Sequence, residues 1–206
     1  KISVCLIEKG SEIGAHILSG AVFETRSLDE LLPNWQDLSY PIHQKVTQDS
    51  FIFLTEKHQI KLPVPPTMKN RGNYIISLSD LCKKLGDIAE DLGVEIYPGF
   101  SGKELCFNKN NEVIGVITGE VGIDKNGEKT ANYQKGMKLL SKQTLFAEGC
   151  RGSLSKQLIT LFNLQKNACP QTYGIGFKEI WQVEHNTKGL VTHTIGWPLK
   201  QDTYGG

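Results

Sequence analysis

The chain has 206 residues, of which 39% are hydrophobic and 22% are charged, and its formal net charge is +1. This size and hydrophobic content allow a sizeable core, in one large domain or in parts of two. The balanced charge gives no electrostatic footprint for nucleic acid, so no nucleic-acid partner is expected. Since no run of about 18 apolar residues occurs, any membrane association is expected to be peripheral.

The cysteines stand singly, at Cys5, Cys82, Cys106, Cys150 and Cys169. Zinc and iron–sulfur sites usually take at least two ligands from one tight turn, and the sequence contains no such pair. The odd count and the scattered positions favour reduced structural thiols in a cytosol-like or matrix-like compartment. No metal ligand is predicted among the cysteines or the scattered histidines.

The first predicted element is a buried strand that ends in a carboxylate, Val4-Cys5-Leu6-Ile7-Glu8. In a doubly wound α/β fold, a strand-terminal carboxylate about 20 residues after a Gly-rich turn binds the ribose hydroxyls of an adenine dinucleotide. The Gly-rich turn is not in this sequence. We therefore expect an interior piece of a larger flavoprotein, although the strand pattern alone also fits an ordinary solvated Glu8.

A loop, a short helix and two strands are expected next. Glycines between residues 10 and 20 mark a loop whose backbone can approach a ligand closely. Ser27 to Glu30 forms a capping box, which predicts a short helix that Pro33 ends. Residues 51–62 predict two strands around a polar turn, and the prolines at 63–66 predict an extended connector.

The clearest helical pattern covers residues 79–92, where leucines and an isoleucine recur every three or four positions before Gly93. A strand over residues 94–97 follows at once. Residues 104–107 and 113–117 then predict a hairpin around a polar turn.

A second apolar strand is predicted from Thr144 to Ala147, before Glu148-Gly149 and a helix over residues 153–162. Glycines just before a helix allow an anion such as a pyrophosphate to approach the free N–H groups of the first turn. An ordinary connection between strand and helix is the alternative. Residues 173–183 and 190–197 predict two long antiparallel strands.

Taken together, several sequence blocks resemble one family. The blocks are Val4–Lys9, Ile13–His16, Leu18–Ala21, Gly72–Ile75, Leu92–Gly99, Phe146–Cys150, Pro170–Gly176, Gly196–Leu199 and Thr203–Gly206. In this order they are similar to electron transfer flavoprotein-ubiquinone oxidoreductase, the electron-transferring-flavoprotein dehydrogenase. The resemblance implies an oxidoreductase of the respiratory chain that takes electrons from reduced electron transfer flavoprotein. It implies FAD, one [4Fe-4S] cluster, and ubiquinone as the electron acceptor.

The resemblance also implies site residues. The FAD-binding set is Glu8, Lys9, Ser19, Gly20, Glu148 and Gly149, with Glu8 on the ribose. Gly205 and Gly206 correspond to the pair whose backbone meets a ubiquinone carbonyl; from the residues alone, this block also fits a plain turn. No acid–base catalytic residue is implied. The cluster cysteines are expected in a C-terminal part outside this chain.

The predicted fold class is α/β, or α+β overall, with an FAD-binding doubly wound Rossmann-like domain interleaved with an antiparallel β-rich quinone domain. Residues 1–50 and 79–168 are assigned to the FAD-binding part. Residues 51–78 are assigned to a β-rich connector or quinone part, and 169–206 to the start of the ubiquinone-binding domain.

The resemblance further implies a monotopic position on a membrane surface. Residues 13–34 correspond to a segment that dips into the bilayer in the family, and their mixture of apolar and charged residues fits a surface loop nearly as well. The expected location is the matrix side of the mitochondrial inner membrane or the bacterial cytoplasmic membrane.

Two other interpretations stay open at this point. Another flavoprotein of the same fold, such as an isoprenoid reductase or an aromatic hydroxylase, would need a polar pocket for an organic substrate. The Gly196–Leu199 and Thr203–Gly206 blocks argue against it. The third possibility is an inactive fragment or assembly module.

Overall fold

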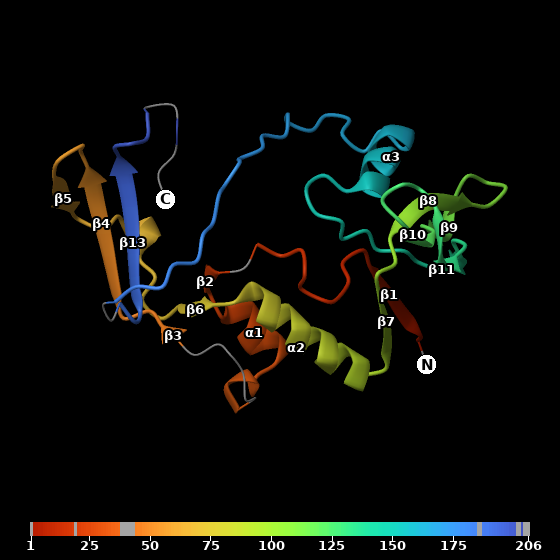
Figure 1. Cartoon of the computed structure of the whole chain (residues 1–206), viewed down its shortest axis with the longest axis horizontal. Helices are drawn as coiled ribbons and strands as arrows, with labels where there is room; N and C mark the ends of the chain where they lie inside the picture. Colours follow the sequence, from red (N-terminus) through yellow and green to blue (C-terminus); the bar gives the residue numbers. More distant parts are fainter. Residues whose placement is uncertain (1, 19, 38–43, 185–186, 201–202, 204–206) are drawn as a thin grey trace. The chain divides into compact units, whose positions relative to one another are not determined.

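The computed structural model describes residues 2–18, 20–37, 44–184, 187–200 and 203. The elements fall into two compact units (Figure 1). The first unit consists of Lys1–Ala15 and Gly86–Phe177, and the second of His16–Leu85 and Lys178–Gly206.

A parallel strand pair forms one part of the first unit. β1 (Val4–Glu8) pairs with β7 (Val94–Pro98), so that Glu8 lies opposite Pro98 at the carboxyl end of both strands. β7 follows directly after α2 (Leu78–Asp91), which is stopped by Gly93 at a φ of 90°. The strand predicted to end at Glu8, the strand predicted over residues 94–97 and the helix predicted at 79–92 are therefore confirmed, the helix with ends shifted by one residue. The expected burial of the first strand is wrong, because among the described residues β1 pairs with β7 alone, and Val4 and Leu6 are 49% and 41% exposed.

Two antiparallel sheets complete the strands of the first unit. β8 (Gly102–Phe107), β9 (Val113–Thr118) and β12 (Lys138–Leu140) form a sheet in the order β12-β9-β8, which confirms the predicted hairpin. The turn between β8 and β9 closes because the Asn108 side-chain oxygen accepts the N–H groups of Asn110 and Glu112, both at 2.9 Å. β10 (Val121–Ile123) pairs with β11 (Lys129–Gln134).

The segment that leads into α3 differs from its prediction. α3 (Ser153–Leu161) confirms the helix predicted at 153–162, but Thr144 to Ala147 form no strand. A strand requires a neighbour to accept and donate its ladder hydrogen bonds, and among the described residues no strand pairs with this segment. Leu145 is accordingly 87% exposed.

The second unit has its core around a small sheet. β2 (Ala21–Phe23), β6 (Tyr74–Ile76) and β3 (Gln44–Lys45) form an antiparallel sheet in the order β2-β6-β3. Side chains from α1 (Arg26–Leu31), the 3-10 turn η1 (Trp35–Asp37), β6 and α2 are buried against one another; they are Leu28, Trp35, Ile76 and Leu81. The Trp35 ring meets the Tyr74 ring edge to face at a centroid distance of 5.5 Å.

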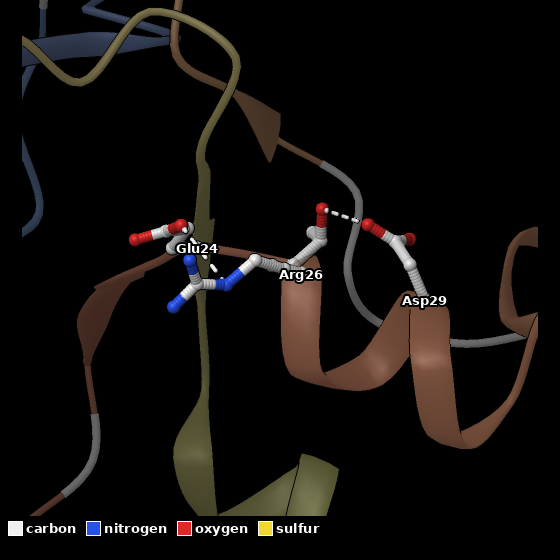
Figure 2. A network of polar contacts seen from close by, with 4 residues as sticks. Glu24, Arg26 and Asp29 are labelled. Atoms are coloured by element: carbon white, nitrogen blue, oxygen red, sulfur yellow. Dashed lines mark hydrogen bonds and ion pairs between the residues drawn. The ribbon is translucent and has the colours of Figure 1, made fainter.

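The start of α1 corrects the capping-box prediction. Thr25, not Ser27, precedes the helix, and its hydroxyl donates to the Asp29 carboxylate at 2.9 Å. Figure 2 shows this exposed corner, where Arg26 Nε also lies 3.9 Å from Glu24 Oε1. Ser27 lies inside the first turn. The register of the helix is fixed by the burial of Leu28 and by the Trp35 indole N–H, which donates to Asp29 Oδ1 at 2.5 Å.

The second sheet of this unit joins distant parts of the chain. β4 (Gln48–Leu54) lies between β5 (Gln59–Leu62) and β13 (Leu190–Gly196), as the orange and blue arrows of Figure 1 show. The two strands predicted within residues 51–62 are confirmed. β13 is also confirmed as a strand, but its antiparallel pairing with residues 173–183 is wrong, because it pairs in parallel with β4 and residues 173–183 form no strand.

The secondary structure is thus mixed α and β with mostly β-sheet, in agreement with the α+β class. Within the described ranges, no helix combines the length and the apolar character needed to cross a membrane.

Candidate functional site: a strand-end carboxylate and a capped helix

Glu8 is positioned by the turn that follows β1. The Phe100 N–H donates to the Glu8 carbonyl at 3.0 Å, and the Gly99 N–H donates to the Gly10 carbonyl at 2.7 Å, so the turns after β1 and β7 are tied together. The Gly10 N–H donates to Glu8 Oε1 at 2.5 Å, which folds the carboxylate back over its own turn. A Cβ at the buried Gly10 would lie 3.1 Å from this oxygen, so glycine allows the arrangement.

This geometry leaves one oxygen of the Glu8 carboxylate, Oε2, able to accept a hydrogen bond from a ligand. Within the described part of the chain, Oε2 accepts no hydrogen bond, while Oε1 is held by the backbone. A carboxylate that is oriented through one oxygen can accept a hydroxyl hydrogen bond through the other. Lys9, the neighbouring member of the predicted set, is exposed.

Glu148 has a different role, since its carboxylate caps α3. Oε2 accepts the Ser155 N–H and the Ser155 hydroxyl, each at 2.7 Å, and Oε1 accepts the Leu154 N–H at 3.2 Å. Partial burial by itself would raise the pKa of Glu148, but the hydrogen bonds from Ser155, Leu154 and Ser153 outweigh it and hold that pKa below its usual value.

The glycines before α3 make this cap possible. Gly149 has a φ of 77°, in the left-handed region that turns the chain back toward the helix. A Cβ on Gly152 would lie 2.6 Å from Glu148 Oε2, so a larger residue would displace the carboxylate. The anion that meets the N–H groups at the start of α3 is therefore the protein's own glutamate. A role of Glu148 and Gly149 in cofactor binding stays a prediction.

The end of β1 and the start of α3, which hold the predicted FAD-binding residues of the first unit, both lie close to Gly102. A Cβ on Gly102 would lie 2.9 Å from Leu154 Cδ1 of α3 and 3.8 Å from Ile7 Cδ1 of β1. The first turn of α3 and the carboxyl end of β1 therefore approach this glycine together. The sequence offered one signal for this contact, a glycine just before the strand predicted at residues 104–107, where β8 has a register shift.

The other predicted residues fall in the second unit or outside the described residues. Gly20 precedes β2 with a φ of 83°, and its carbonyl accepts a hydrogen bond from Lys178 Nζ at 2.5 Å. Ser19, Gly205 and Gly206 lie outside the described residues.

Sequence reasoning missed a polar cluster in the second unit. Asn70 donates from its backbone and its side chain to the Asp49 carboxylate, at 3.0 and 2.9 Å, and its side-chain nitrogen lies 3.3 Å from His193 Nε2. The three residues come from β4, the connector before β6, and β13. No sequence spacing links them, because the parallel pairing of β4 with β13 creates the cluster.

The cysteine thiols are all free, and Cys106 is buried. Burial raises the pKa of Cys82, and burial together with the Glu95 charge raises the pKa of Cys5. Both thiols are thus protonated and poorly nucleophilic at neutral pH. Among the residues that the structure covers, no three His, Cys, Asp or Glu side chains gather as they would around a metal ion.

The chain is similar to a family model and to several known proteins. Residues 173–206 match the family model described as "ETF-QO, ubiquinone-binding". The whole chain is similar to the electron transfer flavoprotein-ubiquinone oxidoreductase of Pseudomonas aeruginosa, with 52% identity over 213 residues, or 39% of that protein. The mitochondrial proteins of Dictyostelium discoideum and Homo sapiens are each 48% identical over 207 and 209 residues, which is 34% of their length.

The chain therefore spans between a third and two fifths of the length of these relatives, while every part of it is aligned. The agreement covers both units. On this basis the chain belongs to the electron transfer flavoprotein-ubiquinone oxidoreductase family.

Proposed function

We propose that the protein containing this chain is an oxidoreductase that passes electrons from reduced electron transfer flavoprotein to ubiquinone. The observation that carries the proposal is the similarity of the whole chain to relatives with this name, together with the ubiquinone-binding match on residues 173–206. The relatives' names give the electron donor and acceptor. We propose electron transfer flavoprotein and ubiquinone as the partners of this protein, and a membrane surface as the place where it acts.

FAD fits the carboxyl end of β1. When bound, FAD would take up electrons and release them again. Glu8 would accept hydrogen bonds from its ribose hydroxyls. The Gly10 N–H at 2.5 Å keeps the carboxylate in one orientation for this contact. The parallel β1–β7 pair, with α2 directly before β7, supports the proposal of a doubly wound domain. Lys9, Ser19, Gly20, Glu148 and Gly149 complete the proposed FAD set.

Ubiquinone is assigned to Gly205 and Gly206, where the absence of a side chain would let a flat ring approach a backbone N–H. We assign residues 1–50 and 79–168 to the FAD-binding part, 51–78 to a β-rich connector or quinone part, and 169–206 to the ubiquinone-binding domain. The isolated cysteines of this chain do not fit a [4Fe-4S] cluster, so ligands for such a cluster would come from elsewhere in the protein.

Membrane contact is proposed for residues 13–34. Leu18 and Leu31 are 56% and 68% exposed, whereas Phe23 and Leu28 pack in the core of the second unit. The exposed leucines are the side chains that could enter the bilayer interface. We place the protein on the inner mitochondrial membrane or the bacterial cytoplasmic membrane.

The test is a turnover assay of the intact protein with reduced electron transfer flavoprotein and a short-chain ubiquinone analogue. The proposal predicts oxidation of the flavoprotein coupled one to one to quinone reduction. Reduction of the bound flavin by a nicotinamide cofactor, with an organic substrate reduced or hydroxylated, would instead support the isoprenoid reductase or hydroxylase alternative. Absence of any flavin would support the inactive-fragment alternative.

A further inference from the structure

The cluster of Asp49, Asn70 and His193 fixes the orientation of an amide. The Asn70 side-chain nitrogen lies 2.9 Å from Asp49 Oδ1, 3.0 Å from the Met68 carbonyl oxygen and 3.3 Å from His193 Nε2. An ionised carboxylate and a carbonyl can only accept hydrogen bonds. The Asn70 amide must therefore direct its nitrogen toward them, since the reverse orientation would place an oxygen against two oxygens.

The orientation of the Asn70 amide in turn determines which tautomer of His193 fits the contact. His193 Nε2 faces the Asn70 amide nitrogen, which carries hydrogens and accepts none. In this geometry Nε2 can only accept, sharing the two Asn70 hydrogens with Asp49 and Met68, and the tautomer that fits the contact carries its proton on Nδ1. The nitrogen that accepts from a fixed partner decides the tautomer of the ring. His193 is thus held as a hydrogen-bond donor through Nδ1.

This donor stands on an apolar sheet face. His193 is the register partner of Phe51, and Phe51 is the partner of Leu62, so the three share one face of the β13-β4-β5 sheet. Two positions further along, Phe53 pairs with Ile195 and with Ile60 on the same face. Phe53 and Ile60 are 37% and 52% exposed. The strand that carries His193 lies inside the segment matched as ubiquinone-binding.

We propose that His193 donates its Nδ1–H to a carbonyl oxygen of the quinone, with Asn70 and Asp49 as the residues that hold its tautomer. The inference rests on the proposed function. A quinone is a flat apolar ring with two carbonyl acceptors, and the face around His193 offers apolar contact beside a fixed donor. His193 acts in positioning the ring, because no proton transfer is needed for this contact.

Two substitutions in the intact holoenzyme separate this role from a structural one. His193→Asn keeps an N–H donor at the Nδ1 position and loses the acceptor for Asn70. His193→Gln keeps an acceptor at the Nε2 position and loses the donor. We expect His193→Gln to raise the KM for a short-chain ubiquinone analogue by about tenfold, the effect of one hydrogen bond. We expect His193→Asn to stay within about threefold of the wild type.

The controls separate failure of this inference from failure of the proposed function. Flavin reduction by electron transfer flavoprotein should be unchanged in both variants, and His58→Gln, in the exposed turn after β4, should leave the quinone KM unchanged. A wild-type KM in His193→Gln, or an equal loss in His193→Asn and His193→Gln, would overturn the inference. Absence of quinone reduction in the wild type would instead overturn the proposed function.

Discussion

Ser155 gives both its backbone N–H and its hydroxyl to the carboxylate of Glu148, at 2.7 Å each, across seven residues of sequence. An N-cap side chain normally satisfies one N–H from the position just before the helix. Here the carboxylate reaches the first turn of α3 from beyond the Gly149 turn, and Gly152 leaves the space it needs. The start of α3 is therefore defined by Glu148, a residue that sequence reasoning assigned to cofactor binding.

Replacement of Glu148 should destabilise the protein through α3. Glu148→Ala removes the acceptor for Ser155 and Leu154, and we expect the free energy of unfolding to fall by about 1 kcal/mol, as for loss of a helix cap. Glu148→Gln keeps one acceptor oxygen and should lose less. Chemical denaturation of the intact protein measures both. Equal stability of Glu148→Ala and the wild type would show that the cap contributes nothing.

The lowered pKa of Glu148 predicts a pH dependence of the same contribution. Because the folded pKa lies below the unfolded value of about 4.3, the stabilisation is complete well above this pH and is lost as the pH falls through the folded pKa. The difference in unfolding free energy between the wild type and Glu148→Gln should therefore shrink as the pH is lowered into this acidic range. A difference that grows on acidification would contradict the assignment.

Gly102→Ala should be destabilising although the φ of Gly102 lies outside the left-handed region. The new methyl would lie 2.9 Å from Leu154 Cδ1, closer than carbon atoms pack. Because Leu154 is only 2% exposed, its side chain has little room to shift, and overpacking of this kind costs about 1–3 kcal/mol. The matched control is Gly86→Ala within α2, where the nearest atom, Ile13 Cγ2, is 3.5 Å away and helix propensity favours alanine by about 1 kcal/mol. Thermal unfolding of the two variants should shift in opposite directions. A shift in the same direction would show that the space around Gly102 is larger than described.

Glu8→Gln should weaken FAD binding while the quinone site stays functional. The amide can keep an oxygen on the Gly10 N–H, but it replaces an anionic acceptor for ribose hydroxyls by a neutral group, and charge-assisted hydrogen bonds contribute about 1.5–3 kcal/mol each. Flavin content after extensive dialysis is the measurement, with saturation by added FAD as the control for folding. Unchanged flavin content would count against the role of Glu8.

Local sequence signals predicted those parts of the structure whose partners are near in sequence. The Leu81 to Leu92 periodicity gave α2, and the polar turn at Asn108 gave the β8–β9 hairpin. Pairings that depend on distant partners were not predictable in this way. β13 matched its strand pattern, but its parallel partner β4 begins at Gln48, so the local hairpin expected with residues 173–183 was the wrong choice.

In the candidate site, too, some residues could be predicted from local sequence, whereas contacts between distant segments could not. Glu8 could be predicted because a strand-end carboxylate has a recognisable pattern, and the structure places it at the carboxyl end of a parallel pair. The Glu148 contact with Ser155 and the Asp49–Asn70–His193 cluster depend on how the backbone turns and how strands pair, so neither has a sequence pattern of its own.

The central claim, that electrons pass from bound flavin to ubiquinone at the end of this chain, is tested most directly by Gly206→Val in the intact enzyme. A branched side chain would occupy the space proposed for the quinone ring. Stopped-flow absorbance should show flavin reduction by electron transfer flavoprotein at the wild-type rate, while reduction of a ubiquinone analogue falls at least about tenfold. Quinone reduction at the normal rate and with normal saturation would contradict the account.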